Sequence, residues 1–334
     1  MTATPTGDPQ EDRAAGDRPT VSLVIPTLGR PENLRRTLAA LGRLDVPPDE
    51  SLEVLVVDNG PSERTRSVVE ASSGTEGPRF RYLAEPEGGT SRARNRGIRE
   101  SRGRLVAFID DDCLVAPSWL RALVEEFSAD PPPDVLGGRV ELHDDRDAPV
   151  GVRTRRERRD CEWTDVFSSI LGCNFCVRRP VIARIGTFDE RLGPGTPLLA
   201  AEDSDFFYRA HSAGLSVRYS PRPLLYHDHG RRSAEQVAAI QRSYVIGRGG
   251  FYAKFILRGD RDVLRLAWWE LRECLATLPP SRRDPDASVS PGRRIAWLAR
   301  GALRWLGSSL TSGGRGSPDS RSGRPAPSAR PTVE

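Results

Sequence analysis

Short apolar runs alternate with amphipathic segments through the N-terminal part of this chain, and this alternation limits the fold more than any other feature. Between two of the runs, segment 32–41 has helical spacing and places Leu34, Leu38 and Leu41 on one face. Four runs have the length and composition of buried strands, at 21–25, 52–57, 80–83 and 105–109. Repeated strand–helix alternation predicts a largely parallel sheet with helices on both faces. We therefore expect an α/β fold.

Polar residues stand at the ends of three of these predicted strands. They are Pro26-Thr27, Asp58-Asn59 and Asp110-Asp111-Asp112. In open α/β sheets, ligands bind beyond the carboxyl ends of the strands. We expect these three strand ends to meet at one crevice.

The negative charges of Asp110, Asp111 and Asp112 must be compensated, because adjacent carboxylates repel one another more strongly as the dielectric constant falls. A cation, a shared proton or full solvation would supply this compensation. Side chains alternate along an extended strand, so Asp110 and Asp112 point the same way, which suits a hard divalent cation that holds phosphate oxygens. A solvated acidic turn that caps the next helix is the alternative.

Three further segments carry polar groups whose roles the residues alone leave open. Glu202 and Asp203 begin a predicted helix, where they either cap it or supply a general base. His227, in an extended segment, fits metal binding, catalysis or a structural hydrogen bond. Gly89 precedes a predicted helix that carries Arg94, which suits either a diphosphate or an ordinary turn with a solvated face.

Composition excludes several classes of protein. The chain has 334 residues and a formal net charge of +4, a basic excess too small for a nucleic-acid binder. The five cysteines are sparse and odd in number, which favours a reducing cytosolic compartment over a disulfide framework. Cys173 and Cys176 form one C-x-x-C pair without a second, so we expect buried thiols in preference to a zinc or redox site. No apolar run reaches about 18 residues, so we expect no membrane-spanning helix.

Taken in order, the motifs from Val21 to His229 resemble glycosyltransferase family 2, which has the GT-A fold. The resemblance covers about two thirds of the chain. Its motifs are Val24-Ile-Pro-Thr27 with Arg30, Val56-Val-Asp-Asn-Gly60, Gly89 through Ala93-Arg94-Asn95-Arg96-Gly97, Phe108-Ile-Asp-Asp-Asp112, Gly172-Cys-Asn-Phe175 with Arg178-Arg179, Ile185-Gly-Thr-Phe-Asp-Glu190, Ala201-Glu-Asp-Ser-Asp-Phe206 and Leu225-Tyr-His227. Asn59 departs from the family pattern, which usually has a second Asp there.

This resemblance implies an inverting transfer of sugar from a nucleotide-diphosphate sugar to an acceptor hydroxyl. The implied donor-binding residues are Pro26, Thr27, Arg30, Asp58, Gly89, Arg94, Asp110 and Asp111. Asp112, with Asp110 and His227, would hold Mn²⁺ or Mg²⁺, and Asp203, with Glu202 beside it, would be the catalytic base. The implied acceptor-side residues are Gly172, Asn174 and Arg178.

The resemblance and the composition together divide the chain into four parts. We expect a disordered N-terminus at 1–18, a GT-A catalytic domain at 19–232, a helical extension at 233–311 and a disordered tail at 312–334. Segment 292–310 is basic and amphipathic, so it either packs against the catalytic domain or contacts the inner face of the plasma membrane. We expect a cytoplasmic enzyme whose acceptor is an envelope polysaccharide or lipid-linked glycan. A small-molecule natural product as acceptor, and a non-catalytic nucleotide-sugar binding protein, are the alternatives.

Overall fold

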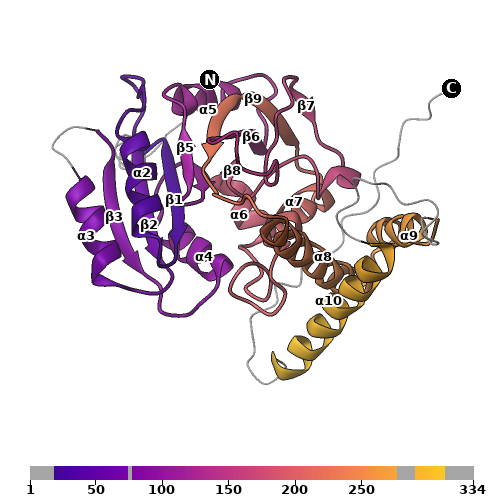
Figure 1. Cartoon of the computed structure of the whole chain (residues 1–334). Coiled ribbons are helices and arrows are strands. Elements are labelled where there is room, and N and C mark those ends of the chain that lie inside the picture. Colours follow the sequence, from indigo (N-terminus) through magenta and orange to yellow (C-terminus); the bar gives the residue numbers. More distant parts are fainter. Residues whose placement is uncertain (1–18, 74–76, 277–289, 313–334) are drawn as a thin grey trace, which may run out of the picture.

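A computed structural model describes residues 19–73, 77–276 and 290–312 of the chain (Figure 1). The two segments expected to be disordered, 1–18 and 312–334, lie outside these ranges except for residue 312. The fold is an α/β sheet flanked by helices with further helices at its C-terminal side, as the sequence predicts.

A nine-stranded mixed sheet forms the centre of the fold, in the order β3-β2-β1-β4-β8-β6-β9-β5, with β7 paired to β9. The strands are β1 (Val21–Thr27), β2 (Leu52–Asp58), β3 (Arg79–Ala84), β4 (Leu105–Ile109), β5 (Cys113–Val115), β6 (Val135–Leu142), β7 (Arg159–Asp160), β8 (Asn174–Arg178) and β9 (Val217–His227). Strands β1 to β4 are parallel to one another, as the alternation predicts. Strand β8 joins them antiparallel to β4 and connects them to the second half of the sheet.

Helices cover both faces of the sheet and define two hydrophobic cores. They are α2 (Pro31–Leu41), α3 (Glu63–Ser72), α4 (Thr90–Glu100), α5 (Trp119–Phe127), α6 (Arg179–Ile185), α7 (Glu202–Ser212), α8 (Ala234–Ile256), α9 (Arg261–Ala276) and α10 (Pro291–Ser312), with a 3₁₀ turn, η1, at Trp163–Asp165. Alternate side chains of β1 enter different cores, since successive residues of a strand face opposite sides. Leu23 packs with Leu34 and Trp119 from α2 and α5, whereas Val24 packs with Ala93 and Phe206 from α4 and α7.

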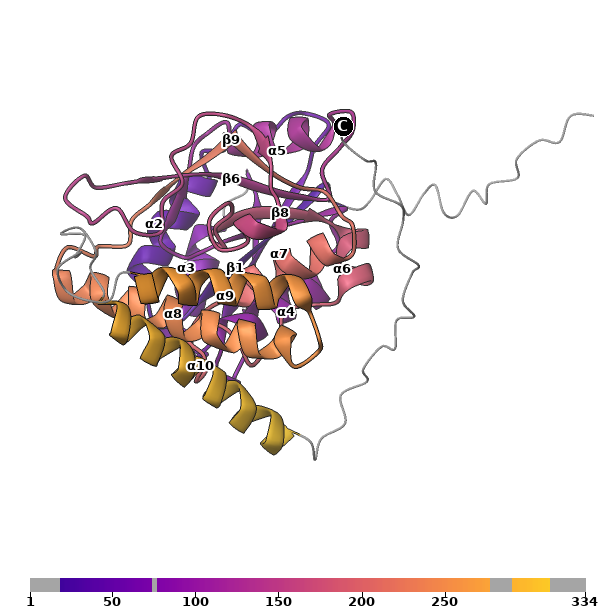
Figure 2. The same cartoon turned by 90° about the vertical axis from the view of Figure 1, so that its right-hand side faces the viewer.

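The C-terminal helices form one layer on the α7 side of the sheet (Figure 2). The helical pattern from 233 to 278 is two helices, because the chain turns between them at Gly259, where φ is +79°. Helix α10 lies directly against α8, since a Cβ added to Gly301 would sit 2.0 Å from the carbonyl oxygen of Ile246. Segment 292–310 therefore packs on the rest of the protein. No helix within the described residues is long and apolar enough to cross a bilayer.

Candidate active site

A pocket of about 740 Å³ opens at the carboxyl ends of β1 and β4. Segments from distant parts of the sequence line it, and the residues that carry polar groups include Thr27, Arg30, Asn59, Arg94, Asp110, Asp112, Arg153, Glu202, Asp203, His227, Arg231, Tyr244 and Arg248. All three predicted strand ends contribute to this list. The acidic start of α7 and the histidine at the end of β9 reach the same pocket.

Asp111 lies beneath the pocket and supports its floor. Its carboxylate accepts a hydrogen bond of 2.7 Å from Thr27 Oγ1 and forms an ion pair with Arg30. Burial raises the pKa of Asp111 to about 7, and Arg30 and Thr27 only partly oppose this effect. Asp110 and Asp112 line the pocket while Asp111 does not. The expected extended segment is wrong here, because β4 ends at Ile109 and Cys113 N donates to the Asp110 carbonyl oxygen at 3.2 Å, which closes a turn.

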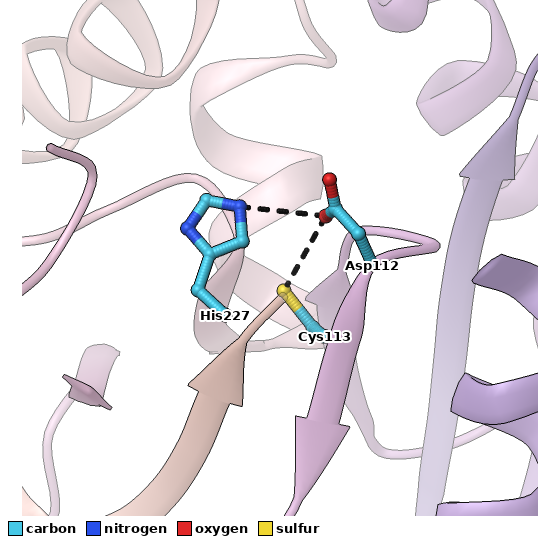
Figure 3. A group of neighbouring side chains, drawn as sticks. All are labelled: Asp112, Cys113 and His227. Carbon is cyan, nitrogen blue, oxygen red and sulfur yellow. Dashed lines mark hydrogen bonds and ion pairs between the residues drawn. The ribbon is translucent and has the colours of Figure 1, made fainter. Parts of the chain in front are cut away.

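Asp112 and His227 face each other across the pocket edge (Figure 3). His227 Nε2 lies 3.4 Å from Asp112 Oδ1, and the other carboxylate oxygen of Asp112 accepts a hydrogen bond of 2.9 Å from Arg30. Burial raises the pKa of Asp112, but its contact with His227 and the charge of Arg30 outweigh burial and hold the pKa at about 2. For the imidazole of His227, burial has the opposite direction and lowers the pKa. The hydrogen bond to Asp112 outweighs burial and raises the pKa of His227 to about 9.

These two side chains fit a divalent cation. His227 Nδ1 lies 3.1 Å from the carbonyl oxygen of Gly151, so Nδ1 carries the proton and Nε2 is free to bind a metal once it loses its own. One ligand atom each from Asp112, His227 and Cys113 lie within 4.8 Å of one another. A carboxylate and an imidazole held by partners of their own are an oxygen and a nitrogen ligand suited to Mn²⁺ or Mg²⁺.

The Arg94 side chain of α4 is only 2% exposed and contacts three other segments of the site. It donates to Glu202 Oε1 at 3.0 Å, to Asp110 Oδ1 at 3.2 Å and to the carbonyl oxygen of Gly172 at 3.0 Å. Burial raises the pKa of Glu202 to about 7, and the neighbouring charge of Asp203 adds to the rise. With these contacts made, Arg94 positions the carboxylates around it.

Asp203 lines the pocket with both carboxylate oxygens oriented by the backbone. Oδ2 accepts from the backbone N–H of Gly172 at 3.0 Å, and Oδ1 accepts from that of Ser204 at 2.7 Å. A Cβ at Gly172 would lie 2.9 Å from Asp203 Oδ2, so a side chain there would displace the carboxylate. Just before α7, Ala201 adopts a left-handed conformation with φ of +74°, which costs about 1–3 kcal/mol for a residue other than glycine.

Five residues expected at the site do not line the pocket, namely Asp58, Gly89, Asp111, Asn174 and Arg178. Asn174 is buried and bridges Trp119 Nε1 and the carbonyl oxygens of Arg139 and Pro223. Arg178 pairs with the first residue of β4, at the opposite edge of the sheet, and its guanidinium contacts Asp134.

Asp58 is fully buried, where it accepts hydrogen bonds from the Ser62 backbone and Tyr82 Oη. Its neighbour Asn59 lines the pocket instead and holds the loop before α4, because its Oδ1 accepts from Gly89 N at 2.6 Å. Gly89 has φ of +129°, a conformation that favours glycine. Gly89 thus shapes the loop that precedes α4.

Other pocket residues are absent from the sequence-based set. Gly151 and Arg153 come from the charged loop after β6, where the sequence carries no motif that indicates a site. Tyr244 and Arg248 come from α8, where the helical pattern gives no sign of a site. All five cysteines are buried and free, which agrees with the expectation of buried thiols.

Comparison with known families decides the assignment. Residues 22–186 match the family described as glycosyl transferase family 2, and 18 curated proteins match the chain. This chain belongs to glycosyltransferase family 2. It is accordingly a glycosyltransferase enzyme.

Relatives of this family 2 protein span most of its length. Glycosyltransferase AglE of Haloferax volcanii is 28% identical over 264 residues, which are 76% of this chain and 80% of AglE. The succinoglycan biosynthesis protein ExoM of Rhizobium meliloti is 29% identical over 251 residues, 74% of this chain and 78% of ExoM. Among solved structures, the mannosyltransferase PcManGT from Pyrobaculum calidifontis, in complex with GDP-Man and Mn²⁺, is similar with a TM-score of 0.57 and 20% identity, covering 86% of this chain and 87% of its own. That likeness shows a shared fold.

Proposed function

We propose that this enzyme transfers a sugar from a nucleotide-diphosphate sugar to an acceptor hydroxyl with inversion, and that Asp203 is the base. One observation carries the proposal: the Asp112–His227 pair and the backbone-oriented carboxylate of Asp203 line the same pocket. A single displacement requires a group that stabilises the leaving diphosphate and a base for the attacking hydroxyl in one cavity.

The donor's diphosphate occupies the part of the pocket near Asp112. Asp112, Asp110 and His227 would hold a divalent ion, Mn²⁺ or Mg²⁺, which would supply positive charge to stabilise the departing nucleotide. Arg30 keeps Asp112 ionised and fixed through its hydrogen bond of 2.9 Å. Arg231 also lines the pocket and lowers the pKa of Asp112 through its charge, so its guanidinium is the direct protein contact we assign to the diphosphate.

The acceptor hydroxyl gives its proton to Asp203. The N–H groups of Gly172 and Ser204 fix the carboxylate in place, which spares it a reorganisation during the reaction. Glu202, bound to Arg94 at 3.0 Å, holds the guanidinium against Gly172 and Asp110 and so fixes the geometry of the base.

We propose a glycan as acceptor, either an envelope polysaccharide or a lipid-linked oligosaccharide. The similarity to ExoM, a succinoglycan biosynthesis protein, over 74% of this chain supports this class. The pocket of about 740 Å³ offers room beyond a donor for a sugar of the acceptor.

A screen of nucleotide sugars with Mn²⁺ that measures released nucleoside diphosphate tests the proposal and identifies the donor. We expect Asp203→Asn to bind the donor nucleotide as the wild type does and to lose about 10²–10⁴-fold in transfer rate, the usual contribution of a positioned base. Asp262→Asn, an exposed change on α9, is the control and retains the wild-type rate. Transfer by Asp203→Asn at the wild-type rate would exclude Asp203 as the base.

A further inference from the structure

One part of the pocket is lined by residues other than the base and the metal ligands, and it adjoins His227 through Gly151. Its walls are the loop at 150–153, Phe167 and Ile170 before β8, and Tyr244 on α8. Tyr244 stands beside the loop, since a Cβ at Gly151 would lie 4.0 Å from its hydroxyl oxygen. This region and Asp203 line the same pocket, so a substrate held at Asp203 can extend into it.

Arg153 places a positive charge in this region without a carboxylate partner. Its Nη1 donates to the carbonyl oxygen of Val152 at 2.9 Å, and its Nε is buried with no hydrogen-bond acceptor. Within the described part of the chain, no Asp or Glu forms an ion pair with Arg153. Burial lowers its pKa below the usual value for arginine, which is the sign of a guanidinium that has lost water without gaining a counter-charge.

Three other pocket arginines differ from Arg153 because each forms an ion pair with a carboxylate. Arg30 pairs with Asp112, Arg94 with Glu202, and Arg248 with Glu270 at 2.9 Å. The remaining pocket arginine, Arg231, acts on the pKa of both Asp112 and Tyr244. The charges of Cys173, Tyr244 and Asp203 act on the pKa of Arg153, and Arg153 lines the same pocket as Asp203.

Asp203 itself does not serve as the counter-ion of Arg153. Its two oxygens accept from the backbone of Gly172 and Ser204, and their orientation toward these groups leaves the Arg153 charge uncompensated. A cation kept beside a base, yet unpaired with it, is available to a group that enters with the substrate.

The loop that carries Arg153 is held in place from several sides. The backbone of Arg153 exchanges two hydrogen bonds with Val140 of β6, at 2.8 and 3.0 Å. The carbonyl oxygen of Gly151 contacts His227, and Asp147 accepts from the backbone N–H of Gly230 at 2.9 Å. A rigid loop fixes the position of the guanidinium relative to the metal ligands, as substrate selection requires.

We propose that Arg153 binds an anionic group of the acceptor, a carboxylate or a phosphate, so that the enzyme selects acidic acceptors over neutral ones. The inference rests on the proposed function, because it assumes that an acceptor sugar lies between Asp203 and Tyr244. The guanidinium offers paired N–H donors that match a carboxylate or phosphate, and such charge-assisted contacts are stronger than neutral ones. An acidic sugar of a polysaccharide and a phosphate-linked carrier present the same chemistry at this position.

Binding of three small glucosides tests the inference. The full chain, saturated with Mn²⁺ and the nucleoside diphosphate of its donor, is titrated calorimetrically with methyl β-glucoside, methyl β-glucuronide and glucose 1-phosphate. The first is neutral, the second carries a carboxylate and the third a phosphate. Arg153→Gln removes the charge, and Arg155→Gln is the matched control, since this arginine is exposed on the same loop.

We expect the wild type and Arg155→Gln to bind at least one anionic probe about tenfold more tightly than the neutral one, as one charge-assisted hydrogen bond supplies. Arg153→Gln loses this preference. Preference for the glucuronide identifies an acidic polysaccharide, and preference for glucose 1-phosphate identifies a phosphate-linked carrier. Equal or undetectable binding of all probes by the wild type, or a preference that survives in Arg153→Gln, overturns the inference.

Hydrolysis of the donor by water separates this result from a failure of the proposed function. If the wild type and Arg153→Gln release nucleoside diphosphate from a sugar nucleotide at equal rates, the donor site is intact and the binding data bear on the acceptor alone. If the wild type releases none from any donor, the proposed function fails first.

Discussion

The ion pairs of Lys254 predict a large loss of stability when the charge of this side chain is removed. It is only 4% exposed on α8, and its Nζ forms ion pairs with Asp189 at 2.8 Å and with Asp205. Asp205 belongs to α7, which begins with Glu202 and Asp203, while Asp189 lies in the segment that precedes it. The ammonium therefore connects α8, α7 and the segment that leads to Glu202 and Asp203.

Lys254→Met keeps the length of the side chain and removes its charge, so it leaves two buried carboxylates without that partner. Breaking a buried ion pair by removing one member costs about 3–5 kcal/mol. Asp189 retains Arg191 at 2.8 Å and Asp205 retains Arg209 at 2.9 Å, so we expect the low end, about 3 kcal/mol. In urea, where small proteins have slopes of about 1–3 kcal/mol per M, this loss lowers the unfolding midpoint by about 1 M or more.

The loss depends on pH in a direction that the carboxylates set. Burial raises the pKa of Asp189, but Arg191 and Lys254 outweigh burial and hold the pKa below its usual value. Asp189 therefore stabilises the fold above its unfolded pKa of about 3.9, and this contribution is lost as pH falls through the lower folded value. Without Lys254, the pKa of Asp189 in the folded state rises. At acidic pH Asp189 therefore takes up a proton, and the variant no longer keeps that negative charge buried. We expect the difference in unfolding free energy between wild type and variant to be smaller at pH 4 than at pH 7.

Urea unfolding followed by circular dichroism at both pH values measures these differences. Arg242→Met, an exposed change on the same helix, is the control and should stay within about 0.5 kcal/mol of wild type. Equal midpoints for wild type and Lys254→Met at pH 7 would refute the reasoning. So would a difference that does not shrink between pH 7 and pH 4.

Three other changes have expected outcomes. Gly172→Ala places a Cβ 2.9 Å from Asp203 Oδ2 and should lower kcat about tenfold or more while nucleotide affinity is kept, measured by steady-state kinetics and calorimetry; an unchanged kcat would contradict it. Asp112→Asn should weaken Mn²⁺-dependent nucleotide binding about tenfold or more in a calorimetric titration with and without Mn²⁺, and equal affinities would count against Asp112 as a ligand. Gly301→Val forces α10 away from Ile246 and should lower the free energy of unfolding by about 1–3 kcal/mol, which a chemical denaturation curve detects; wild-type stability would show that α10 shifts freely.

Three strands of the parallel half, β1, β2 and β4, are predictable from the sequence because they are buried on both faces. Such strands are continuous apolar runs, as at β1 and β4. The second half gives a weaker signal. Pro221 and Pro223 interrupt β9, and proline is rare inside strands. Gly137 and Gly138 interrupt β6, where any Cβ would meet Ile170 or Asn174.

The strand ends and the later motifs each predict part of the site. Asp110 and Asp112 reach the pocket because parallel strands bring their carboxyl ends to one edge. Arg178 does not, although it lies close to Gly172 in the sequence. Strand β8 runs antiparallel to β4, so its two ends lie at opposite edges of the sheet, and order along the chain does not reveal which end faces the ligand.

The pocket residues of helix α8 are not predictable from the sequence, for a different reason. It contacts other elements on several sides: Gly247 against Ala200, Gly249 against Leu298 of α10, and Phe251 in the core. A helix buried on several sides has no single apolar stripe, so its pattern does not reveal which residues face a pocket. Yet Tyr244 lines the pocket, and Gly247 packs on the strained segment that leads to Asp203. Helix α8 is thus part of the wall of the pocket, although the sequence carries no motif there that indicates a site.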